Sequence, residues 1–87
     1  MDIQFHPDAF NDYQQWATDD KKVFAKINAL IKETCRTPFT GTGKPEPLKG
    51  NLAGFWSRHI TGKHRLVYKP EEDVLIIAGC KSHYGDK

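Results

Sequence analysis

The fold is decided by the stretch FWSRHITGKHRLVYK, residues 55–69. Its first six and last six residues predict two strands. The Thr-Gly-Lys between them predicts a three-residue hairpin loop, in which Gly62 is available for a positive φ. The stretch therefore predicts an antiparallel hairpin, and the register of that hairpin decides which side chains share a face.

This register links the fold to a candidate site. If Ile60 pairs with His64, then His59 lies opposite Arg65. Side chains alternate between the two faces of a strand, so His59 and Arg65 are expected on the open face of the sheet. Lys81 and His83 share one parity on the last strand and could join them there, but that strand is apolar on both faces and its pattern does not assign their face. The opposite face, toward the predicted helices, carries Trp56, Ile60, Leu66 and Tyr68.

The segments before the hairpin predict one strand and two helices. Residues 3–5 predict a short strand, and Pro7 suits the first turn of a helix that extends to about Thr18. Asp20 and the two residues before it supply an N-cap for a second helix. Because the connection is so short, the two helices form an αα-hairpin. The buried stripe of the second helix is predicted to be Val23, Ile27, Leu30, Ile31 and Thr34.

The remaining segments complete an α+β pattern. Residues 37–47 form a loop rich in glycine and proline, and a loop of that length in a small domain is usually functional or mobile. Residues 70–73 predict a turn. Val74 to Cys80 is a continuous apolar run, typical of a central strand covered on both faces. We expect one domain over residues 1–87 with the order β-α-α-β-β-β, an antiparallel sheet packed on a helix hairpin.

Composition places the chain among soluble globular proteins. It has 87 residues, of which 38% are apolar and 28% charged, enough to bury a modest core. No apolar run approaches the ~20 residues that cross a bilayer. The N-terminus lacks a signal-peptide pattern, so we expect the cytoplasm and no membrane partner. Cys35 and Cys80 lie outside any CxxC pattern, and neither a disulfide nor a metal site with the histidines is expected.

Positive charge is concentrated in the middle of the chain. Residues 44–69 hold six lysines and arginines and one carboxylate, a net charge of +5, whereas residues 1–43 have a net charge of −1 and residues 70–87 of −2. Such a stretch indicates a polyanionic partner. A solvated basic face has the same composition, so charge alone does not decide between them.

The segment GKPEPLK, residues 43–49, places Glu46 between two prolines that rigidify the backbone. RNA cleavage needs a base for the 2′-hydroxyl, cations for the phosphate and an acid for the leaving 5′-oxygen. Glu46 is the candidate base, Arg65 can bind the phosphate bidentately, and His83 is the candidate acid, since histidine has a reference pKa of about 6.5. Each residue also has a structural alternative. Glu46 would lie in a solvated loop, Arg65 would be a surface strand residue, and His83 would be a frayed terminal residue.

Four further residues are candidates for binding the substrate. Lys49 can act as a point charge beside Arg65. Tyr84 can stack on an unpaired base, as aromatic side chains do in proteins that bind single-stranded RNA. Lys44 and His59 belong to the same basic stretch and complete the predicted substrate-binding set.

At these residues the chain resembles the YoeB-type toxins of the RelE superfamily, which are bacterial toxin–antitoxin messenger-RNA interferases. The resemblance extends from about residue 5 to Tyr84. It is densest in INALIK (27–32), RTPF (36–39), GKPEPLK (43–49), GFWSR (54–58), HRLVY (64–68) and HY (83–84).

The resemblance implies a RelE-like, microbial-ribonuclease-like fold and cleavage of messenger RNA in the ribosomal A site, beside 16S ribosomal RNA, without a metal or other cofactor. The family's base matches Glu46, its acid His83 and its phosphate-stabilising arginine Arg65. A supporting cation matches Lys49, and a substrate-positioning aromatic matches Tyr84. The implied partners are a YefM-like antitoxin whose C-terminal segment covers the site, a second copy in a homodimer, and operator DNA through the antitoxin complex.

Three features depart from the family pattern. His59 stands where members commonly carry a second arginine, so one cation is weaker or pH-dependent. The turn at residues 61–63 replaces a typically acidic one and adds positive charge beside Arg65. The chain continues past Tyr84 with Gly-Asp-Lys at 85–87, which can crowd the site.

Three functional hypotheses follow. The leading one is a ribosome-dependent endoribonuclease, because Glu46, Arg65 and His83 are present together. The second is a non-catalytic inhibitor of the ribosome or of gyrase on the same fold. The third is a co-repressor that acts with its antitoxin, and it can coexist with the first.

Overall fold

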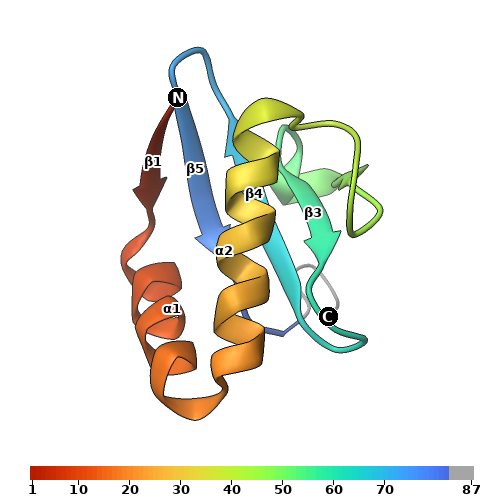
Figure 1. Ribbon diagram of the computed structural model, residues 1–87. Coiled ribbons are helices and arrows are strands. Elements are labelled where there is room, and N and C mark those ends of the chain that lie inside the picture. Colours follow the sequence, from red (N-terminus) through yellow and green to blue (C-terminus); the bar gives the residue numbers. More distant parts are fainter. Residues whose placement is uncertain (83–87) are drawn as a thin grey trace.

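The computed structural model describes residues 1–82, which form two helices packed on a five-stranded sheet (Figure 1). The predicted α+β class and the helix hairpin are confirmed. No helix within this range is long and apolar enough to cross a membrane. The elements are β1 (Asp2–Phe5), α1 (Pro7–Asp19), α2 (Lys21–Arg36), β2 (Glu46–Pro47), the 3₁₀ helix η1 (Gly50–Leu52), β3 (Trp56–His59), β4 (Arg65–Pro70) and β5 (Val74–Gly79).

The sheet is mixed, whereas the sequence predicts a wholly antiparallel one. Its strand order is β1-β5-β4-β3-β2. β1 pairs with β5 in parallel, with Asp2 opposite Val74 and Phe5 opposite Ile77, and the other neighbouring strands pair antiparallel. The chain order alone did not reveal the partner of β1, because both helices and the remaining strands separate it from β5.

The β3–β4 hairpin has the predicted register, with His59 opposite Arg65. Its loop closes by a different device from the predicted one, since Gly62 does not adopt a positive φ. Instead, Thr61 Oγ1 accepts hydrogen bonds from the backbone N–H groups of the second and third residues after it, at 3.1 and 3.0 Å. A side-chain oxygen therefore supplies the turn geometry that was expected from glycine.

The helix pair begins and packs as predicted. Asp20 caps α2, accepting hydrogen bonds from the backbone N–H groups of Lys22 (3.1 Å) and Val23 (3.2 Å). Such a cap contributes about 1 kcal/mol. Of the predicted stripe on α2, Val23 is half-buried and the other four residues are buried. They pack against a core that includes Ala9, Trp16, Ile60, Leu66, Tyr68, Leu75, Ile77 and Cys80.

β5 is central in the sheet, but only one of its faces is fully buried. Leu75 and Ile77 are inaccessible to solvent, whereas Ile76 and Ala78 are partly exposed. The prediction that both faces are covered is wrong for β5, because the two helices pack on the same side of the sheet (Figure 1) and the other face of this strand stays partly exposed. That open face carries the candidate site.

Candidate active site

Three adjacent strands bring Glu46, His59 and Arg65 to the open face. Glu46 on β2 lies opposite Ser57 on β3, and His59 on β3 lies opposite Arg65 on β4. Directly opposite residues share a face, as do residues two apart on one strand. The structure therefore places these three predicted site residues on one surface, at the edge of the sheet where β2 is only two residues long.

The carboxylate of Glu46 and the guanidinium of Arg65 face each other. Glu46 Oε1 lies 3.8 Å from Arg65 Nη1, and the side chains are 56% and 21% exposed. An ion pair of that length and exposure contributes little to stability, about 0–1 kcal/mol. Within residues 1–82, the buried Arg65 Nε has no hydrogen-bond partner. The Arg65 side chain remains partly exposed, so its guanidinium can contact an anionic ligand, although not through the buried Nε.

The end of the described chain lies beside Arg65. The backbone N–H of Arg65 donates to the carbonyl oxygen of Ser82 at 3.2 Å, and the backbone N–H of Ser82 donates to His64 Nδ1 at 2.7 Å. Burial, followed by the charges of two nearby lysines, lowers the pKa of His64, which keeps this acceptor neutral. His83 and Tyr84, the predicted acid and aromatic, lie outside the described residues.

Lys81 does not join Arg65, so that expectation is wrong. Its Nζ lies 5.8 Å from the centre of the Trp16 ring, and Trp16 belongs to the core on the helix side. β5 ends at Gly79, so Lys81 lies beyond the strand, and the alternation on which the expectation rested does not extend to it.

Lys44, His59 and Lys26 surround a hollow of about 250 Å³, which Gly43 also lines and which neither Glu46 nor Arg65 lines. Lys44 has a φ of 53°, a left-handed conformation that costs a residue other than glycine about 1–2 kcal/mol. Lys44 and His59 were both selected from the sequence, and Lys26 on α2 lines the same hollow. Lys49 is exposed immediately before η1.

Arg58 is the residue that sequence reasoning missed. It was counted only among the basic residues of its stretch, yet its side chain is 0% exposed. Alternation along β3 places it on the helix-facing side with Trp56 and Ile60. A charged residue on a buried face indicates a hydrogen-bonded structural role, and this signal was present in the sequence. Its guanidinium donates hydrogen bonds to Tyr68 Oη (3.2 Å), Glu33 Oε2 (3.3 Å) and the carbonyl oxygens of Thr42 (3.1 Å), Thr40 (2.9 Å) and Thr37.

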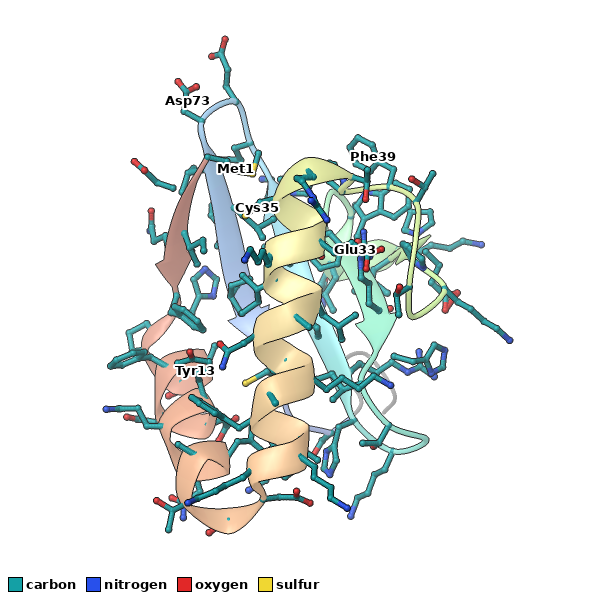
Figure 2. All side chains as sticks on the ribbon, viewed as in Figure 1. Met1, Tyr13, Glu33, Cys35, Phe39 and Asp73 are labelled. Carbon is teal, nitrogen blue, oxygen red and sulfur yellow. The ribbon has the colours of Figure 1, made fainter. Side chains whose placement is uncertain are left out.

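Glu33 and Tyr68 hold the loop of residues 37–43, which Arg58 also contacts. The backbone N–H of Thr42 donates to Glu33 Oε2 at 2.7 Å, and Tyr68 Oη donates to the carbonyl oxygen of Pro38 at 2.7 Å. The hydrogen bond from Thr42 lowers the pKa of Glu33, and the charge of Arg58 adds to the effect. Burial raises the pKa of Tyr68. Glu33 extends from α2 toward this loop in Figure 2.

The described residues contain no evident metal-binding cluster. Across residues 1–82, no three His, Cys, Asp or Glu side chains gather in a way that could hold an ion. Cys35 and Cys80 are free thiols. Cys80 is a small buried core residue, and burial raises its pKa to about 12.

Comparison with known proteins identifies the family. The family model described as "YoeB-like toxin of bacterial type II toxin-antitoxin system" matches residues 5–84. The chain is 55% identical to toxin YoeB of Escherichia coli K12 over 84 residues, which is 97% of this chain and 100% of that protein. A YoeB/ParE toxin from Agrobacterium tumefaciens has a similar structure, with a TM-score of 0.93 and 44% identity over 97% of this chain and 100% of that one.

Staphylococcus aureus YoeB has also been solved as a dimer (TM-score 0.90) and in a heterotetrameric YoeB-YefM complex (TM-score 0.89). Each is 47% identical to this chain and covers 97% of it and 98% of the solved chain. The resemblance drawn from the six sequence segments is thereby confirmed. The chain belongs to the family of YoeB-like toxins of bacterial type II toxin–antitoxin systems.

Proposed function

We propose that this toxin is a ribosome-dependent endoribonuclease that cleaves messenger RNA in the ribosomal A site and so inhibits translation. The observation that carries the proposal is the pairing of Glu46 with Arg65, 3.8 Å apart on the open face of the sheet. A carboxylate and a partly exposed guanidinium supply a proton acceptor and a phosphate ligand at one place. The surrounding basic stretch attracts a polyanion to them.

The proposed reaction is an in-line transesterification. Glu46 takes the proton from the 2′-hydroxyl, the 2′-oxygen forms a bond to phosphorus, and the bond from phosphorus to the 5′-oxygen breaks. His83 donates a proton to that leaving oxygen, which yields a 2′,3′-cyclic phosphate and a 5′-hydroxyl. Arg65 exchanges its contact with Glu46 for the phosphate, and this exchange frees the carboxylate to act as the base.

The remaining predicted residues hold the substrate. Lys44 and His59, which line one hollow, contact the flanking phosphates. Lys49 adds a point charge, and Tyr84 stacks on a base. The catalytic set is sparse and exposed, so it gains most when another body aligns the substrate. Correct alignment is worth effective molarities of up to about 10⁵–10⁸ M. The ribosome is that body in this proposal.

We also propose the partners from the relatives. A YefM-like antitoxin binds this chain, as YefM binds S. aureus YoeB, and its C-terminal segment covers Arg65 and His83. Two copies form a homodimer, as in the S. aureus dimer, and operator DNA is contacted through the antitoxin complex. Because translating ribosomes are the site of action, the toxin acts in the cytoplasm.

Mapping of messenger-RNA 5′-ends after brief induction tests the proposal. New ends within translated codons are expected for the wild type and should be lost in Glu46→Gln and in His83→Ala, since each acid–base group contributes roughly 10²–10⁴ in rate. Glu72→Gln, an exposed carboxylate in the turn before β5, is the matched control and should cleave normally. Growth arrest without new ends would instead establish a non-catalytic inhibitor of the ribosome or gyrase.

A further inference from the structure

We propose that Arg58 and Glu33 are positioning residues that hold Glu46 opposite Arg65. This inference rests on the proposed function, because it assigns the two residues to the placement of the catalytic base. Together with Tyr68 they form a cluster, here called the clamp, on the side of the sheet that faces the helices. The clamp fixes the loop of residues 37–43, and that loop leads directly to Glu46.

The strand that carries Glu46 is too short to place it alone. β2 consists of Glu46 and Pro47 at the edge of the sheet, and Pro47 has no backbone N–H to donate. An edge strand of two residues offers few ladder hydrogen bonds, and the chain before it has no regular structure. The position of Glu46 therefore depends on how the preceding loop is held.

The loop is held by its backbone at nearly every residue. Carbonyl oxygens of five of its residues accept hydrogen bonds, three from Arg58, one from Tyr68 and one from the backbone N–H of His59, at 2.7 Å from the oxygen of Gly43. Glu33 Oε2 accepts a hydrogen bond from the backbone N–H of Thr42. Because backbone atoms make these contacts, the clamp specifies the path of the chain rather than any side chain on it.

Glycines stand where the loop comes closest to its surroundings. Gly41 has a φ of 116°, and a Cβ there would lie 2.0 Å from Glu33 Oε2. Gly43 has a φ of 88°, and a Cβ there would lie 2.9 Å from the carbonyl oxygen of His59. A loop that only connected two elements would not need to approach these groups so closely.

Arg58 has no donor left for a substrate. A guanidinium carries five N–H donors, and Arg58 makes five hydrogen bonds: one from Nε, two from Nη1 and two from Nη2. Its side chain is also fully buried. Its influence on the reaction must therefore pass through the loop and Glu46.

Glu33 is the better residue at which to test this role, because its side chain is partly exposed whereas that of Arg58 is fully buried. Glu33→Ala is expected to lower the maximal cleavage rate on programmed ribosomes by between about 10-fold and 10²-fold, the cost of a small misplacement. The ribosome concentration at half-maximal rate should not change. Glu33→Gln, which keeps an oxygen for the N–H of Thr42, should recover most of the rate.

Glu71→Ala is the matched control. Its carboxylate lies 3.4 Å from Lys69 Nζ, in an exposed ion pair at the start of the turn before β5, so this variant also removes a glutamate from an ion pair but leaves the loop untouched. Its cleavage rate should equal that of the wild type. Amide hydrogen exchange provides a reading that is independent of activity: Thr42 should exchange faster in Glu33→Ala and not in Glu71→Ala.

A double-mutant cycle with Glu46→Gln decides between positioning and general stability. If Glu33 acts through Glu46, then Glu33→Ala lowers the rate in the wild-type background and has no further effect in the Glu46→Gln background. An equal loss in both backgrounds, or no loss in either, would overturn the positioning role alone. A Glu46→Gln variant that cleaves at the wild-type rate would overturn the assignment of the base, and the positioning role with it.

Discussion

Two arginines of one hairpin have opposite environments. Arg58 on β3 points toward the helices, is fully buried, and uses every N–H donor of its guanidinium. Arg65 on β4 points to the open face, makes one ion pair of 3.8 Å, and leaves its buried Nε without a partner among residues 1–82. Two residues of the same type thus serve different purposes on the two faces of the sheet.

The difference shows how hydrogen-bond saturation distinguishes structure from function. A buried cation that is fully hydrogen-bonded stabilises the chain around it, and removing it leaves its acceptors unsatisfied. A partly exposed cation with a single long ion pair can exchange that contact for an anion. Arg58 therefore belongs to the scaffold of the site, and Arg65 to its ligand-binding surface.

Replacing each arginine with methionine should give the largest difference between the two sites, both in stability and in cleavage rate. Arg58→Met removes the counter-ion of Glu33, which keeps only the hydrogen bond from Thr42, and leaves several carbonyl oxygens without their donor. We therefore expect a loss of about 3–5 kcal/mol in the free energy of unfolding. Arg65→Met should change that free energy by less than about 1 kcal/mol and lower the cleavage rate by on the order of 10²–10³. Urea denaturation followed by tryptophan fluorescence, with a cleavage assay, measures both. Equal destabilisation by the two variants would contradict the comparison.

Much of the open face was predictable from the sequence, because it depends on local patterns. The register of one hairpin placed His59 opposite Arg65, and alternation alone then put both on one face. Glu46 was selected for its proline-flanked segment, and the structure brings it to the same surface. These inferences needed only a short-range pairing and the period of a strand.

The clamp was not predictable in the same way, since it joins distant segments. Glu33 on α2, Arg58 on β3 and the loop of residues 37–43 meet only in the folded chain, and many of the acceptors are backbone carbonyls that carry no sequence signal. Alternation along β3 did indicate from the sequence that Arg58 lies on the buried, helix-facing side. The direction of β1 and the irregular pairing of β5 with β4 also depend on tertiary contacts, and sequence patterns do not report them.

Two glycines sharpen the contrast between the clamped loop and the hairpin turn. Gly41→Ala introduces a Cβ 2.0 Å from Glu33 Oε2 at a φ of 116°, so we expect a loss of about 1–3 kcal/mol in the free energy of unfolding and slower cleavage. Gly62→Ala has no atom within 4 Å of the added Cβ and no positive φ. It should leave stability unchanged or raise it by up to about 1 kcal/mol. Thermal denaturation distinguishes the two, and a Gly41→Ala variant as stable as Gly62→Ala would show that the loop yields easily.

The smallest effect concerns the contact that brings Ser82 beside Arg65. The neutral His64 accepts a hydrogen bond from the backbone N–H of Ser82, and burial lowers the pKa of His64 below its ordinary value of 6.5. The unfolded chain therefore binds a proton more readily than the folded one, and this contribution to stability, present above about pH 6.5, is lost as the pH falls through the lower folded-state pKa. His64→Asn offers an amide oxygen that does not titrate, so its stability should fall less steeply than that of the wild type below pH 6.5. Denaturant titrations at several pH values measure both slopes, and parallel curves would show that His64 does not couple the end of the described chain to pH.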